Sequence, residues 1–181
     1  MPRIQPTAID SLGPRVQRSN AHNTPFAGES TPCAVLRRQR VRGGGHELVL
    51  VHHPASVKVG RHTLTSEVGE TINDDELLHA VSVVVSELLG NAVRHAAPTA
   101  EGAIILRWQE RGGVIDLEVR DGGSPGEVRP QRPNREAPGG RGLRIVRHLS
   151  DEWGVHVEPT SGLRTVWAAL GGPSRRRRRS P

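Results

Sequence analysis

Residues 86–95 read SELLGNAVRH, and they lie inside a longer pattern over residues 75–97 that decides the fold. Apolar residues recur there at three- and four-residue spacing, which predicts an α-helix with one buried face. Asp74 or Asp75 can accept hydrogen bonds from the free N–H groups of the first turn, and Pro98 ends the helix. The apolar positions are Leu77, Leu78, Val81, Val84, Val85, Leu88, Leu89 and Val93.

Three polar residues of this helix, Glu87, Asn91 and His95, follow one another at four-residue spacing. They therefore form one polar column beside the apolar face. A carboxylate, an amide oxygen and an imidazole next to a buried face indicate a functional site. The alternative is an exposed helix on which a carboxylate pairs with Arg94, and this stretch alone leaves both interpretations open.

Charge is distributed unevenly along the 181 residues, whose net charge is +6. Residues 1–45 carry +5 and the five arginines of residues 175–179 carry another +5, whereas residues 46–174 carry −4. The basic character therefore lies in the two tails. We expect no nucleic-acid binding by the central part. The arginine tail could still bind nucleic acid or an acidic partner by counterion release.

The cellular context follows from what the sequence lacks. Cys33 is the single cysteine, which excludes an internal disulfide framework and a cysteine metal cluster. No run approaches the roughly 18 apolar residues that span a bilayer, and no apolar region follows the first charges as in a secretory signal. We expect a soluble, cytoplasmic protein that does not bind a membrane.

Composition divides the chain into three parts. Residues 1–45 mix Pro, Ser, Asn, Arg and Gly without a period, so we expect a disordered extension. Residues 46–171 form the folded domain, and residues 172–181 form a disordered, arginine-rich tail. Within the domain we predict a helix over 54–69 and another after Gly139, and strands over 46–53, 102–111, 114–120, 152–158 and 163–170.

Two glycine-rich stretches flank a loop over residues 124–138 that is rich in Pro, Arg and Glu. Asp121-Gly122-Gly123 directly follows a strand, and its glycines allow the backbone to approach a ligand closely. An ordinary Asp-Gly turn has the same sequence pattern and is the alternative. Residues 138–146 read PGGRGLRIV, a glycine loop that opens a helix and suits phosphate, or else a flexible linker. A loop of this length between them is compatible with a functional lid.

The order of these motifs resembles the GHKL ATPases, a group that includes histidine kinases, DNA gyrase B and MutL. ELLGNAVRH is similar to their N box, DGG to the DxGxG element, GGRGLRIV to the second glycine box, and LRTVW to the final threonine strand. The resemblance covers residues 46–170. Within the group, RGLRIVRHLSDEWGV and TVWAAL most resemble the actinobacterial anti-sigma-factor serine/threonine kinases.

The resemblance implies a phosphate side of an ATP site. Asn91 would offer its amide oxygen to Mg²⁺, which prefers oxygen ligands. Glu87, one turn earlier, would be the general base. Gly140 and Gly142 would let the loop wrap the phosphates, and Arg141 would add positive charge.

The resemblance also implies a base side. Asp121 would accept a hydrogen bond from the adenine amino group, and Gly123 would let the base lie against the backbone. Thr165 would lie beneath the adenine and share a bridging water with Asp121. Two positions depart from the family pattern: Pro125 stands at the last glycine of DxGxG, and Pro138 at the first glycine of the second box.

The predicted fold is an α/β two-layer sandwich of the histidine-kinase-like ATPase type. A mixed, mostly antiparallel sheet of about five strands carries three helices on one face. The implied function is an ATP-binding anti-sigma-factor-type serine/threonine kinase that uses Mg²⁺. Its implied partners are a sigma factor, an anti-sigma antagonist that it phosphorylates, or both, and the resemblance is compatible with a homodimer. The alternative is a non-catalytic module that sequesters a partner and binds ATP weakly or not at all.

Overall fold

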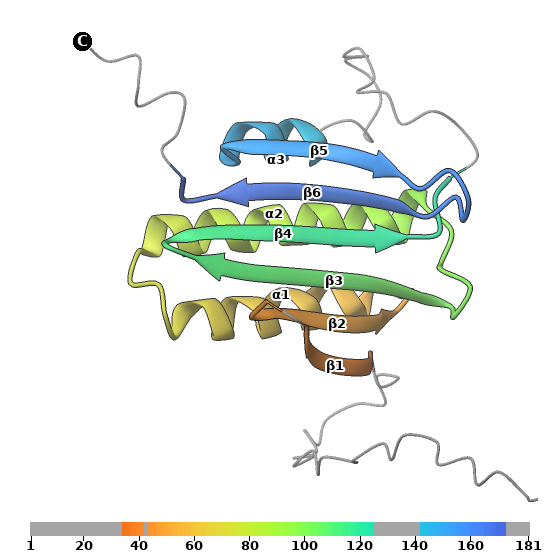
Figure 1. The fold of residues 1–181 in the computed structure, drawn as a ribbon, viewed down its shortest axis with the longest axis horizontal. Coiled ribbons are helices and arrows are strands. Elements are labelled where there is room, and N and C mark those ends of the chain that lie inside the picture. Colours follow the sequence, from red (N-terminus) through yellow and green to blue (C-terminus); the bar gives the residue numbers. More distant parts are fainter. Residues whose placement is uncertain (1–33, 42, 125–141, 173–181) are drawn as a thin grey trace, which may run out of the picture. The chain divides into compact units, whose positions relative to one another are not determined.

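The computed structural model describes residues 34–41, 43–124 and 142–172. Figure 1 shows the elements of these residues. In chain order they are β1 (Val35–Val41), β2 (Gly45–Val51), α1 (Ala55–Gly69), α2 (Asp75–His95), β3 (Ala103–Arg111), β4 (Val114–Asp121), α3 (Gly142–Leu149), β5 (Glu152–Val157) and β6 (Arg164–Leu170).

The strands form one six-stranded sheet in the order β1-β2-β3-β4-β6-β5, and each neighbouring pair is antiparallel. The three helices lie together behind this sheet, with α2 in contact with both α1 and α3 (Figure 1). This arrangement confirms the predicted two-layer α/β sandwich. It differs in two details, because the described part contains six strands instead of about five and their pairing is antiparallel throughout.

Strand β1 corrects the predicted boundary of the folded domain, because residues 35–41 lie within the extension predicted to be disordered. Its sequence VLRRQRV is exposed over its five central residues, so no apolar period marks it as a strand. It is stabilised by its backbone ladder with β2 and by Glu47, whose Oε1 accepts from Gln39 Nε2 at 2.8 Å and Arg37 Nη2 at 3.2 Å. The predicted disorder of residues 1–33 and 173–181 concerns residues outside the described part.

Helix α2 forms as its sequence predicts. The side chain of Asp74 accepts a hydrogen bond from the Leu77 N–H at 3.0 Å and caps the helix. By length and composition alone α2 could cross a membrane, but a core helix passes the same test. Its apolar face belongs to the core between helices and sheet, and its buried residues are Val81, Val84, Val85, Leu88, Leu89, Gly90 and Ala92.

Strand β4 has two different faces. Its side chains alternate, because successive residues of a strand point to opposite sides of the sheet. Asp116 and Glu118 are exposed on the open face, together with the half-buried Arg120. The other face packs toward the helices and contains the buried residues Ile115, Leu117, Val119 and Asp121.

Candidate functional site

Two predicted residues of α2 lie directly against the start of α3. Glu87 and Asn91 are half-buried and one helical turn apart. A Cβ atom added to Gly142, the first residue of α3, would lie 2.6 Å from Glu87 Oε2 and 3.2 Å from both Oδ1 and Nδ2 of Asn91. The chain thus brings Glu87, Asn91 and Gly142 together, and this close approach of α3 to α2 leaves no room for a side chain at position 142.

The electrostatics at the start of α3 suit an anion held beside a cation. The first N–H groups of a helix are free, and the helix dipole places partial positive charge at the start of α3. Arg94, on the next turn of α2, donates from Nη2 to Asn91 Oδ1 at 3.4 Å. Its guanidinium lies over Gly90, where an added Cβ would be 2.9 Å from Nη1. Arg94 therefore contacts the amide of the site, and no contact between it and a carboxylate is seen in residues 34–41, 43–124 and 142–172.

The turn after β4 lies between the end of α2 and the segment before β6. Gly122 N–H donates to the Ala97 carbonyl at 2.9 Å, and Ala97 N–H donates to the Gly123 carbonyl at 2.7 Å. Gly123 has φ +80°, and an added Cβ would lie 2.6 Å from the Gly162 carbonyl oxygen. Both the backbone conformation and the close approach require glycine there. Asp121 Oδ1 accepts from the Gly123 N–H at 2.8 Å, which holds the turn.

Thr165 does not lie where the resemblance implied. The ladder between β4 and β6 pairs Asp121 with Arg164 and Arg120 with Thr165. Thr165 Oγ1 accepts from Arg120 Nε at 3.3 Å on the open face, so its side chain points away from Asp121. The expectation that Thr165 shares a water with Asp121 is corrected, because adjacent residues of a strand face opposite sides of the sheet.

Arg164 occupies the position opposite Asp121 instead. Its Nη2 donates to Asp121 Oδ2 at 2.9 Å in a buried ion pair. Residue type and spacing did not single out Arg164. Only the strand register, which sequence patterns do not specify here, turns it toward Asp121.

Gly140 and Arg141 lie outside the described residues, as do Pro125 and Pro138. Within the described ranges no group of three or more His, Cys, Asp or Glu side chains could hold a metal ion. Asn91 can still fit Mg²⁺, because this ion commonly takes only one or two protein oxygens and completes its shell with phosphate oxygens and water.

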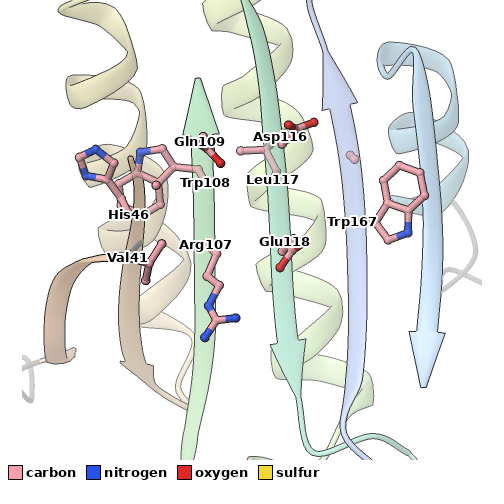
Figure 2. A pocket seen from close by; sticks show the side chains of 11 residues that line it. Val41, His46, Arg107, Trp108, Gln109, Asp116, Leu117, Glu118 and Trp167 are labelled. Atoms are coloured by element: carbon pink, nitrogen blue, oxygen red, sulfur yellow. The ribbon is translucent and has the colours of Figure 1, made fainter. Parts of the chain in front are cut away.

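A groove of about 280 Å³ lies on the open face of the sheet, away from these residues (Figure 2). Arg107, Glu118 and Trp167 line it from β3, β4 and β6, and none of the predicted site residues does. Arg107 Nε donates to Glu47 Oε2 at 2.7 Å. Burial raises the pKa of Glu47, but hydrogen bonding and charge from Arg107, with the bonds from β1, bring this pKa below its ordinary value. Glu47 of β2 thus connects residues of β1 with Arg107 of β3, and we assign these contacts a structural role.

A family model described as the histidine kinase-like ATPase domain matches residues 50–169. The match extends from β2 into β6 and includes Glu87, Asn91, Asp121 and Gly142. None of the curated proteins matches the chain. The match spans more than half of the sequence and agrees with the six-stranded sheet and its three helices, so the chain belongs to the histidine kinase-like ATPase domain family, of the GHKL type.

Proposed function

We propose that the domain binds Mg-ATP on the helix side of the sheet, between α2, the start of α3 and the end of β4. The observation that carries this proposal is the close approach of the start of α3 to Glu87 and Asn91, which a Cβ at position 142 would obstruct. Phosphate groups suit this position, because free N–H groups and the positive end of the helix dipole meet there. Family membership supports ATP as the nucleotide.

Asn91 would hold Mg²⁺ through its amide oxygen. Its half-buried position one turn from Glu87 suits a metal shared with phosphate oxygens. When bound, the ion would neutralise charge that develops on the transferred phosphoryl group. Arg94 Nη2 donates to Asn91 Oδ1 and would help to orient this amide.

We further propose that the protein is a serine/threonine kinase of the anti-sigma-factor type. Glu87 would accept the proton of a serine or threonine hydroxyl as that oxygen attacks the γ-phosphorus, and ADP would leave. The support for this chemistry is the carboxylate beside the start of α3 together with the sequence resemblance. The proposed partner is a sigma factor, an anti-sigma antagonist that receives the phosphate, or both.

A second candidate is a module that sequesters its partner and binds ATP weakly or not at all. One observation favours it. Both oxygens of Asp121 already have partners, since Oδ1 accepts from Gly123 and Oδ2 from Arg164. A nucleotide base that donates a hydrogen bond to Asp121 must therefore add to these two bonds or replace one of them.

Calorimetric titration of Mg-ATP separates the two candidates. We expect the wild-type protein to bind ATP and Asn91→Ala to lose binding. Thr165→Val should bind as the wild type does, because this side chain lies on the open face. Glu87→Gln should keep ATP affinity and lose transfer of labelled γ-phosphate to serine or threonine. A wild-type protein that binds no ATP would exclude the kinase and favour the sequestering module.

A further inference from the structure

The ion pair between Asp121 and Arg164 is almost completely removed from water. The side chains are 1% and 8% exposed, and Arg164 Nη2 lies 2.9 Å from Asp121 Oδ2. The two residues end one strand and begin another, on the same face of the sheet as α2 and α3. A pair in this position lies at the predicted base side of the nucleotide site.

Arg164 is not fully satisfied by this pair. Its Nε atom is buried and has no hydrogen-bond partner in the described part of the chain. Buried polar atoms in folded proteins nearly always have partners, so an unpaired buried donor needs an explanation. A ligand that supplies an acceptor is one such explanation, and the position beside Asp121 points to the base.

We propose that Arg164 is a specificity-determining residue that reads the base together with Asp121. This inference rests on the proposed nucleotide-binding function. An ionised carboxylate only accepts hydrogen bonds and a guanidinium only donates them. The pair therefore suits a heterocyclic edge on which a donor stands beside an acceptor.

Adenine has such an edge, because its exocyclic amino group lies between two ring nitrogens that accept hydrogen bonds. Asp121 would accept from the amino group, and Arg164 would donate to the neighbouring ring nitrogen. Guanine has the same chemistry in its ring N–H and its carbonyl oxygen, so both nucleotides belong in the test. A purine without an exocyclic group would satisfy Arg164 and leave Asp121 without its donor.

The test measures how much each ring nitrogen of the base contributes to nucleotide affinity in the wild type and in variants of Arg164. Mg-ATP, Mg-GTP and the 1-deaza and 7-deaza analogues of ATP, each lacking one ring acceptor, are titrated into the wild type and Arg164→Lys. Lysine keeps a charge for Asp121 but lacks the planar fork of arginine, so this variant should fold. Arg164→Met removes both, and thermal unfolding shows whether it stays folded. Thr165→Val is the neighbouring control on the opposite face.

In the wild type we expect one deaza analogue to bind about 10- to 100-fold more weakly than ATP, as for loss of a hydrogen bond from a charged donor. Arg164→Lys should bind ATP more weakly and lose this discrimination, and Thr165→Val should keep it. If wild type and Arg164→Lys show the same ratios, Arg164 does not read the base and the inference is wrong. The inference is equally wrong if Arg164→Lys or a folded Arg164→Met binds ATP more tightly, since Arg164 would then compete for Asp121. Absence of all nucleotide binding in the wild type would instead overturn the proposed function itself.

Discussion

Replacing Gly142 by alanine should separate nucleotide binding from folding. The added Cβ would lie 2.6 Å from Glu87 Oε2 and 3.2 Å from the amide of Asn91, so those side-chain ends must move. A displaced rotamer costs about 0.5–1.5 kcal/mol. Alanine offsets this by up to about 1 kcal/mol, because it restricts the unfolded chain and favours the helix. The free energy of unfolding should therefore change by less than about 1 kcal/mol.

Affinity for Mg-ATP should nevertheless fall at least about tenfold, which corresponds to roughly 1.4 kcal/mol. The reason is that the methyl group displaces Glu87 and Asn91, the two side chains proposed to act on the phosphates and their metal ion. Urea unfolding measures the free energy of unfolding, and calorimetric titration measures the affinity for Mg-ATP. Gly69→Ala is the matched control, because its added Cβ would meet only Leu78 Cδ1, at 3.9 Å. If Gly142→Ala binds ATP as tightly as Gly69→Ala does, the phosphates do not lie at the start of α3.

Three further predictions concern stability. Gly60→Ala should lower the free energy of unfolding by about 1–3 kcal/mol, because its Cβ would lie 2.6 Å from Leu89 Cδ1 in the core; urea unfolding measures this. Asp74→Ala should cost about 1 kcal/mol through loss of the α2 cap, whereas Asp74→Ser should recover most of it in the same assay. The pKa of Glu47 lies below its ordinary value of 4.5, so its stabilising contribution is complete above pH 4.5 and is lost as pH falls through the folded-state pKa. When the free energy of unfolding is measured at decreasing pH, it should fall less steeply in Glu47→Gln than in the wild type. An equal slope in both proteins would contradict the role of Arg107.

Local patterns in the sequence predicted most of the elements, because their causes lie close together along the chain. The apolar spacing, the cap at Asp74 and Pro98 place α2 within about two residues of its observed ends. The strands predicted over residues 102–111 and 114–120 likewise lie within one residue of β3 and β4. Local patterns do not predict strand β1, because its stability comes from pairing with β2 and from contacts to Glu47. Glu47 lies 8 to 10 residues away from its partners in β1.

Residue types at short, fixed spacings predicted the polar column of α2 and the Asp-Gly-Gly turn after β4, and the order of the motifs along the chain indicated the family of the domain. Which of these residues contact one another depends on packing between segments that are far apart in the chain. The packing of α3 on α2 brings Gly142 to Glu87 and Asn91, which precede it by more than 50 positions. The register of β4 and β6 turns Arg164 toward Asp121 and Thr165 away from it. A one-residue difference in register would exchange these two side chains between the faces of the sheet, and register is set by hydrogen bonds between distant segments.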